Sequence, residues 1–316
     1  MFNGIVNVYK EQGYTSHDVV AKLRGIYGQK KVGHTGTLDP MAEGVLIVVL
    51  GQATKLSDII VSGTKRYIAT MRLGLTTETD DITGEIKKSF SRDELMNTFA
   101  FLSDEVSIRN EIHDVMMKYL GKSMQVPPMY SAIKVNGKKL YEYAREGKTI
   151  ELLPRPIEIY SLDVLSVDMD TLDVRFGVVC SKGTYIRSLI RDIGNDLGTG
   201  ATMSKLLRDE VNGIRYEDGY KINDLQKLKE IDRLGTSVLP MDEILKDTPA
   251  VNINPSGEKY LDNGNRLIQD DFDIQGEANI YTLNASQFFR VYSEGKLKAL
   301  YVYDNEKNDY KVYKML

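Results

Sequence analysis

The spacing of hydrophobic and polar residues changes several times along this 316-residue chain. After Thr15, the apolar residues Val19, Val20, Leu23 and Ile26 recur at helical spacing. Thr15 with Asp18 three residues later is typical of a capping box, which fixes where this helix begins. The apolar run at 45–50, the alternation at 67–73 and the runs at 157–167 and 172–180 instead predict strands.

Further helices are expected at 53–61, from Ser91 onward, at 140–146 and at 183–197. Asn136-Gly137 is the dipeptide most typical of a tight hairpin turn. Helices and strands therefore intermix without the regular alternation of a doubly wound sheet. We expect an α+β fold, with a mixed, largely antiparallel sheet flanked by helices.

The last third of the chain has a different pattern. Residues 225–244 are expected to be helical and linker-like, and short strands follow at 288–292, 297–303 and 309–314. This predicts a first domain over 1–246 and a small β-rich domain over 247–316. Within the first domain, Pro127-Pro128 precedes a Tyr-rich and basic segment, 129–156, which we expect to project as a mobile flap.

Composition narrows the class of protein. Hydrophobic residues make up 42% and charged residues 27%, as in an ordinary globular protein. The N-terminal residues do not resemble a signal peptide, and no apolar run is long enough to span a bilayer. Cys180 is the only cysteine and there are three histidines, so we expect a cytoplasmic protein with no disulfide and no metal site.

Net charge is −4, yet residues 118–155 hold eight Lys or Arg against three Glu. Such a segment can make a local nucleic-acid contact, but on charge counts alone a solvated charged face is the favoured interpretation. Residues 247–316, with eight basic and eleven acidic side chains, are mildly acidic.

Gly33-His34-Thr35-Gly36-Thr37-Leu38-Asp39-Pro40 places one carboxylate in a glycine-rich loop ahead of a buried strand. Pro40 restricts Asp39 toward an extended backbone, and a carboxylate held this way suits covalent or acid–base chemistry. The alternative is that Asp39 caps a helix whose first residue is Pro40. Both interpretations stay open at this stage.

Two further motifs carry chemistry. Ser181-Lys182-Gly183-Thr184-Tyr185-Ile186-Arg187 joins a strand to a helix, where backbone N–H groups favour anions and Arg187 could bind a phosphate or a carboxylate. Lys65-Arg66-Tyr67 enters a strand, and Tyr67 could stack on a nucleobase. The alternatives are a surface charge for Arg187 and core packing for Tyr67 and Tyr185.

Taken together, these motifs closely resemble the bacterial tRNA pseudouridine-55 synthase family. The matching stretches are 33–40 with Gly44-Val45-Leu46, then Lys65-Arg66-Tyr67 with Leu73-Gly74, then 128–138 and 181–187. They occur in the family's order and spacing, over roughly residues 4–212. Tyr9-Lys10-Glu11 stands where the family has Asp-Lys-Pro, which keeps the lysine.

The resemblance implies a pseudouridine-synthase sheet, a PUA-like RNA-binding C-terminal domain over 247–316 and an RNA-gripping insertion at 129–156. It implies that Asp39 is catalytic, that Arg187 pairs with it and that Tyr67 stacks on the target uracil. It also implies substrate-binding roles for a further set of residues: His34, Tyr185, Leu206, Lys10 and Lys134.

The implied reaction isomerises uridine to pseudouridine in the T-loop of tRNA, at position 55. The nucleotide must be flipped out of its stack, and neither a metal nor a nucleotide cofactor is expected. Asp39 could attack C1′, attack C6 or deprotonate C2′. We expect a monomer that binds the T-arm of tRNA. The alternatives are a guide-RNA-dependent pseudouridylase and a tRNA-folding protein with incidental catalysis.

Overall fold

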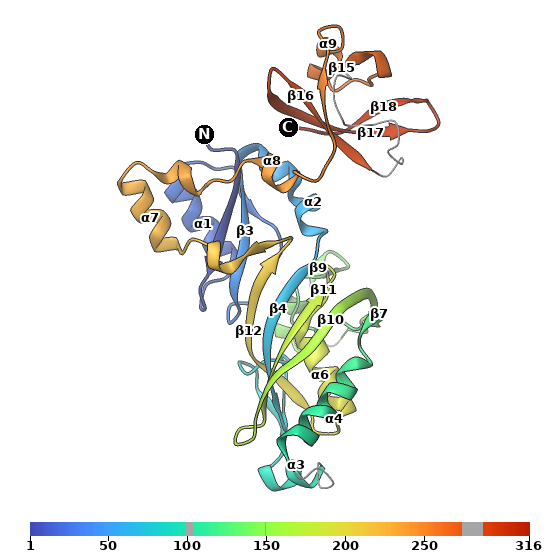
Figure 1. Ribbon diagram of the computed structural model, residues 1–316. Coiled ribbons are helices and arrows are strands. Elements are labelled where there is room, and N and C mark those ends of the chain that lie inside the picture. Colours follow the sequence, from blue (N-terminus) through green and yellow to red (C-terminus); the bar gives the residue numbers. More distant parts are fainter. Residues whose placement is uncertain (99–103, 149, 274–286) are drawn as a thin grey trace.

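The computed structural model describes residues 1–98, 104–148, 150–273 and 287–316, and Figure 1 shows a long, twisted main sheet with a smaller sheet beyond one end. The nine strands of the main sheet are β1 (Gly4–Lys10), β2 (Val32–His34), β3 (Glu43–Leu50), β4 (Lys65–Leu73), β7 (Gly121–Gln125), β10 (Arg155–Asp168), β11 (Asp173–Cys180), β12 (Ala201–Val211) and β13 (Ile214–Arg215).

The main sheet has the order β1-β3-β12-β4-β11-β10-β7, with β2 paired to β3 and β13 paired to β12. Only the β12–β3 pair is parallel. All other pairs in this sheet are antiparallel. The α+β class and the mixed, largely antiparallel sheet are therefore confirmed.

Two groups of helices cover different parts of this sheet. Helices α1 (Ser16–Tyr27) and α7 (Ile222–Glu230) pack beside β1 and β3, with Val19 and Leu23 in a shared apolar cluster. Helices α4 (Glu105–Met117) and α6 (Ile186–Asp196) cover β4, β10 and β11 (Figure 1). The capping box at the start of α1 forms as predicted.

The second sheet has the order β15-β14-β16-β17-β18. Its strands are β14 (Ala250–Ile253), β15 (Phe272–Asp273), β16 (Phe288–Ser293), β17 (Lys296–Asp304) and β18 (Asp309–Met315), with α9 (Glu258–Asp262) beside them. The three predicted strands are β16, β17 and β18, and the small β-rich C-terminal domain is confirmed. The boundary between residues 246 and 247 stays a prediction.

The expected single helix at 225–244 is wrong. The chain instead forms α7, a 3-10 turn at Leu234–Ser237 and α8 (Met241–Ile244). The cause is tertiary, because Leu239 exchanges two backbone hydrogen bonds with Ile5 of β1, at 2.9 and 2.8 Å. An extended residue that pairs with a strand cannot also lie in a helix.

The helix expected at 53–61 is only partly α-helical. A 3-10 helix covers Gly51–Leu56 and continues into α2 (Ser57–Val61). The main domain also contains α3 (Arg92–Thr98) and the hairpin of β5 (Leu75–Thr77) and β6 (Ile86–Ser89). None of the helices in the described ranges combines the length and the apolar composition that crossing a lipid bilayer requires.

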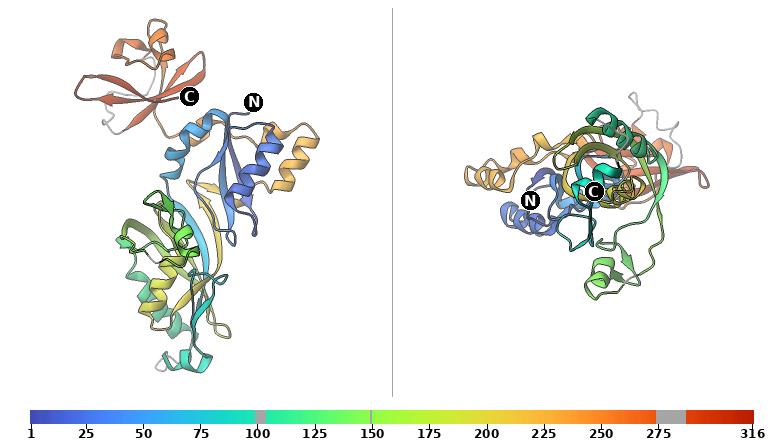
Figure 2. Two further views of the ribbon diagram at one scale, coloured as in Figure 1. Left: turned by 180° about the vertical axis from the view of Figure 1, so that it is seen from behind. Right: turned by 90° about the horizontal axis from the view of Figure 1, so that it is seen from below.

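The segment 129–156, here called the insertion, leaves the main sheet after β7 and rejoins it at β10. Its described part forms the hairpin β8 (Lys134–Val135) and β9 (Lys138–Lys139) and the helix α5 (Leu140–Arg145). Asn136 and Gly137 both have positive φ, 52° and 81°, as the predicted tight turn requires. Viewed from below, the insertion lies to one side of the main sheet (green in Figure 2, right).

Candidate active site

Asp39 lies in the loop between β2 and β3. Pro40 and Met41 form a turn, in which the Ala42 amide donates to the Asp39 carbonyl at 3.0 Å, and β3 begins at Glu43. The proposed helix start at Asp39-Pro40 is therefore wrong. The apolar residues that follow form a buried strand, and its pairing with β1 leaves no room for a helical turn.

Neighbouring elements fix this loop by hydrogen bonds on both sides of Asp39. The Leu38 amide donates to Ser16 Oγ at the start of α1, at 2.9 Å. The ammonium group of Lys10 donates to the carbonyls of Pro40, at 3.3 Å, and Ala42, at 2.6 Å. The Gly13 amide also donates to the Pro40 carbonyl, at 2.9 Å. The backbone that carries Asp39 is thus held by the first strand and helix.

Gly44 brings the end of this loop close to β12. Its φ is +104°, and a Cβ atom there would lie 2.1 Å from the carbonyl oxygen of Arg208. Only glycine fits this close approach, which occurs where β3 and β12 run parallel. The Asp39 loop and β12 therefore border the same space.

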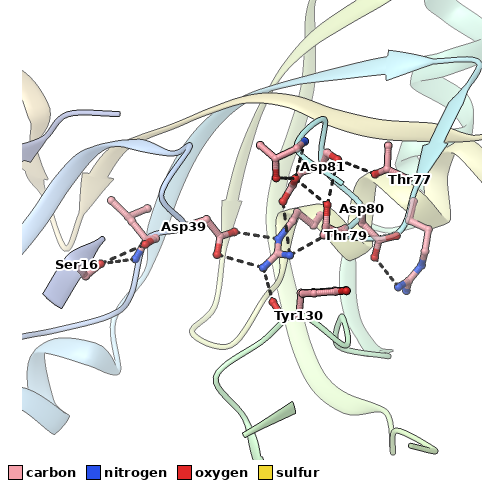
Figure 3. Close-up of polar contacts among 11 residues, drawn as sticks. Ser16, Asp39, Thr77, Thr79, Asp80, Asp81 and Tyr130 are labelled. Atoms are coloured by element: carbon pink, nitrogen blue, oxygen red, sulfur yellow. Dashed lines mark hydrogen bonds and ion pairs between the residues drawn. The ribbon is translucent and has the colours of Figure 1, made fainter. Parts of the chain in front are cut away.

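Arg187, in the first turn of α6, binds both carboxylate oxygens of Asp39. Its Nε lies 2.9 Å from Oδ2, and its Nη2 lies 3.2 Å from Oδ1 (Figure 3). Arg187 also donates to the carbonyls of Thr79, at 3.0 Å, and Tyr130, at 2.9 Å. The Arg187 side chain is 6% exposed, so this planar group joins three separate segments in a buried setting.

A second carboxylate, Asp81, faces the same guanidinium at 3.8 Å. The hydroxyl groups of Thr79 and Thr83 donate to Asp81 Oδ1, at 2.8 and 2.5 Å, as Figure 3 shows. Sequence reasoning treated residues 76–84 only as an acidic turn and missed this contact. Nothing in the local pattern indicates which distant arginine such a turn will meet.

The environment of Asp39 shifts its protonation. Burial raises the pKa of Asp39 above its ordinary value of 3.8, and the nearby Asp81 charge adds to this. The charge and hydrogen bonds of Arg187 act in the opposite direction but do not outweigh burial. The side chain still keeps 33% of its surface exposed, so it can be reached by a ligand.

That exposed surface faces a cavity of about 440 Å³. Five of the residues singled out from the sequence line it together: Asp39, Tyr67, Tyr185, Arg187 and Leu206. Among the described residues that line the cavity, Asp39 is the single carboxylate, whereas the basic side chains are Lys65, Lys139, Lys182, Arg187 and Arg208. The cavity is therefore suited to a negatively charged ligand.

The floor of the cavity comes from adjacent strands. Tyr67 of β4 lies opposite Arg208 of β12, and Ala69 lies opposite Leu206. Because side chains alternate between faces along a strand, Lys65 and Tyr67 share one face. Burial raises the pKa of Tyr67, so its hydroxyl stays neutral and its ring offers an apolar surface beside Asp39.

Three predicted substrate-binding residues do not line this cavity. Lys10 is fully buried beneath the Asp39 loop, and burial lowers its pKa to about 8. His34 is half-buried and lies edge-on to His17, with ring centroids 5.4 Å apart, and it is His17 that borders the cavity. Lys134 is exposed on β8.

The insertion contributes further lining residues that sequence reasoning did not place at the catalytic cavity: Tyr130, Ser131 and Ala132 of the family-like stretch, with Lys139 and Tyr141. The Lys139 ammonium lies 5.3 Å from the centre of the Tyr141 ring and 3.2 Å from its hydroxyl. The alternation of Lys and Tyr in this segment was the available signal, because cations and aromatic rings at short spacing often pair.

Comparison with known proteins identifies the family. Residues 24–186 match the N-terminal domain of the TruB family pseudouridylate synthases, and residues 187–246 match the tRNA pseudouridylate synthase B C-terminal domain. The chain belongs to the TruB family of pseudouridylate synthases. The pair formed by Asp39 and Arg187 therefore lies within the part of the chain that defines this family.

Curated members of the TruB family match this chain over most of its length. It is 42% identical over 320 residues to the tRNA pseudouridine synthase B of Lachnoclostridium phytofermentans, with 99% of each chain covered. It is 43% identical over 277 residues to the same enzyme of Staphylococcus saprophyticus, with 86% of this chain and 87% of that protein covered.

Solved structures agree on the fold. The chain is similar to a chain in the crystal structure of a Cbf5-Nop10-Gar1 complex, with a TM-score of 0.69, 26% identity and coverage of 99% of this chain and 84% of that one. A structure of an H/ACA RNP bound to a substrate RNA containing 2′-deoxyuridine matches with a TM-score of 0.68 and 25% identity. Within the described residues, no group of three or more His, Cys, Asp or Glu side chains is arranged to hold a metal ion.

Proposed function

We propose that this protein isomerises uridine to pseudouridine in tRNA, at the T-loop uridine of position 55, with Asp39 as the catalytic carboxylate. Family membership and the curated tRNA pseudouridine synthase B relatives support the reaction and the tRNA substrate. The observation that carries the role of Asp39 is its position, since it is the single acid among the described residues that line a basic cavity and Arg187 holds both of its oxygens.

The chemistry requires four things of the site. The C1′–N1 bond must break, the base must turn, a C1′–C5 bond must form and the C5 proton must leave. A flipped-out nucleotide can lie with its base on the Tyr67 ring, which holds it by stacking while leaving it free to rotate. Asp39 then faces the sugar and the base edge, with Arg187 fixing the direction of the carboxylate.

Arg187 acts as a positioning residue in this proposal. Its contact with the Tyr130 carbonyl links the insertion, which would grip the RNA, to the carboxylate. Tyr185 and Leu206 border the same cavity and would enclose the base. Lys10 supports the Asp39 loop from beneath, whereas His34 and Lys134 are proposed to contact RNA outside the cavity.

The test is release of tritium from C5-labelled uridine in a T-arm stem-loop. We expect the parent to release it from the T-loop uridine alone and Asp39→Asn to be slower by about 10²–10⁴-fold. Binding of the stem-loop by Asp39→Asn should remain close to that of the parent. Equal release by both proteins would remove Asp39 from the chemistry, and binding without release by the parent would favour a tRNA-folding role.

We further propose that the protein is a cytoplasmic monomer. Size-exclusion chromatography with light scattering should give the 35.7 kDa mass of one chain. A mass of twice this value, at the concentrations used for activity, would contradict the proposal.

A further inference from the structure

The basic side chains of the active-site cavity are not balanced by acids. The only carboxylate among its described lining residues, Asp39, is already paired with Arg187. Lys65, Lys182 and Arg208 make no ion pair of 4 Å or less within the described chain. Buried charges are normally paired with an opposite charge, so a buried cation without a carboxylate partner is unusual.

Two of the three cations are deeply buried. Lys65 is 7% and Arg208 is 1% exposed. Lys65 Nζ donates to the backbone carbonyls of Val61, at 2.9 Å, and Gly63, at 3.0 Å. Arg208 donates to the backbone carbonyls of Val45 and Gly36, at 2.8 and 3.1 Å, and also forms a hydrogen bond with the Tyr67 side chain. The third N–H of Lys65 has no partner among the described residues.

The three cations converge from adjacent elements. Lys65 lies opposite Cys180 at the end of β11, and Lys182 follows two residues later. Arg208 lies opposite Tyr67, which is two residues from Lys65 on β4. Lys182 also precedes α6, whose N-terminal end adds partial positive charge to the same side. The pairing of β4 with β11 therefore brings the motif at 65–67 next to the motif at 181–187, which the sequence indicated as suited to anions.

We propose that Lys65, Lys182 and Arg208 form a subsite for an RNA backbone phosphate next to the flipped-out uridine. The proposal rests on the proposed function, which supplies the RNA. Two residues along a strand span about 7 Å, so Lys65 lies within one nucleotide's reach of a base stacked on Tyr67. A phosphodiester would supply the anion that the chain itself lacks here.

The energetics of Lys65 agree with this arrangement. Burial, together with the charges of Arg208 and Lys182, lowers the pKa of Lys65 to about 8, while Cys180 acts in the opposite direction. The free protein therefore holds this ammonium at a cost, and a bound phosphate would offset that cost. In the alternative, Lys65 only caps the carbonyls at the end of α2, and it would then be indifferent to any phosphate of the RNA.

The experiment is a set of T-arm stem-loops in which one phosphate near the target uridine is replaced by a neutral methylphosphonate. Binding is measured with Asp39→Asn present throughout, so that no RNA is converted. We expect one position at which neutralisation weakens binding roughly tenfold. Adding Lys65→Met or Lys182→Ala should weaken binding of the unmodified RNA. In these variants, the methylphosphonate at that position of the RNA should cause no further loss of affinity.

The variants are chosen to separate folding from binding. Lys182 is exposed, so its replacement leaves the buried contacts of Lys65 intact. Lys227→Ala, an exposed residue of α7 outside the cavity, is the control and should keep the full tenfold loss. Equal losses in the parent background and in both cavity variants at every position would overturn the subsite.

Tritium release by the parent on the unmodified stem-loop distinguishes the two proposals. Suppose that the parent releases tritium, but that each methylphosphonate weakens binding by the same factor with and without Lys65→Met or Lys182→Ala. The subsite is then wrong and the proposed function stands. If the parent releases no tritium from stem-loop or full-length tRNA, the proposed function itself fails.

Discussion

The Asp39 loop and the insertion differ in how the protein holds them. The loop is held by other elements: Lys10 of β1, Ser16 of α1 and Gly13 in the turn between them. The insertion is held mainly from within, by the contact of Lys138 with Glu146 and by its buried residue Leu140. Chemistry needs a fixed carboxylate, whereas gripping a large RNA needs a surface that can adapt to it.

Arg187 is the point at which these two regions meet, so its loss should have the largest effect. Arg187→Met removes both bonds to Asp39 and the bond to the Tyr130 carbonyl, and we expect turnover to fall by about 10²–10³-fold. Because Asp81 would remain without the opposing cation, the pKa of Asp39 should rise further. The acid limb of the rate profile, which requires ionised Asp39, should move to higher pH.

Single-turnover rates from pH 4 to 8 test this expectation. Arg187→Lys keeps the charge but not the planar fork, and it should restore the acid limb more than the rate. An acid limb at the same pH in parent and Arg187→Met would show that Asp39 does not set it.

Replacement of Tyr67 tests the fixed part of the site, around the Asp39 loop. Replacement by leucine removes the aromatic face beside Asp39, and loss of stacking worth about 1–3 kcal/mol predicts a rate lower by roughly 5- to 150-fold. Affinity for the stem-loop should change less, because the insertion still binds it. Tyr67→Phe is the matched control, and a Tyr67→Leu rate equal to that of Tyr67→Phe would exclude stacking.

Replacement of basic residues in the insertion tests whether this segment binds the RNA. Replacing Lys134, Lys138 and Lys139 with alanine should weaken tRNA binding by about tenfold and flatten its dependence on salt, since each lost phosphate contact lowers the slope by about 0.7–0.9. Binding titrations at several salt concentrations measure both quantities. Turnover at saturating RNA should change less than affinity.

The control for this set replaces three exposed lysines of α1 and α7 that lie away from the insertion: Lys22, Lys227 and Lys229. Their replacement should leave the salt slope unchanged. A slope that falls equally in both triple variants would mean that the insertion has no special part in binding.

The smallest expected effect concerns stability beneath the Asp39 loop. Lys10 has a pKa of about 8 when folded and 10.5 ordinarily, so between these values the unfolded chain binds more protons. Stability should therefore rise with pH from 8 to 9.5, where Lys65 contributes in the same direction. Urea unfolding at pH 8 and 9.5 measures this rise in the free energy of unfolding. It should be smaller in Lys10→Met than in the parent by roughly 1–2 kcal/mol. Equal rises would exclude Lys10 as a source.

Local sequence signals predicted local structure well. The capping box at Thr15 and the turn at Asn136-Gly137 depend on residues a few positions apart, and both formed. The helix expected at 225–244 failed because Leu239 pairs with Ile5, a contact that local periodicity does not encode.

The site was predicted on different grounds. Nothing between Asp39 and Arg187 in the sequence indicates that they meet across 148 positions, and only the resemblance to a family placed them together. The resemblance gave no role to Asp81, Arg208 or Lys65. The contact of Asp81 with Arg187 and the positions of Lys65 and Arg208 at the cavity were therefore not predicted. Those residues depend on strand register and on the packing of α6, which appear only once the sheet is assembled.

The two sheets of this protein also share apolar packing. Leu300 of the small sheet lies in one cluster with Ile60 and Leu245 of the larger part, and Lys314 pairs with Asp58 beside it. Separating the sheets would expose that cluster to water. Heating should therefore melt the chain in a single calorimetric transition, and proteases should not release a folded C-terminal fragment before the whole chain unfolds.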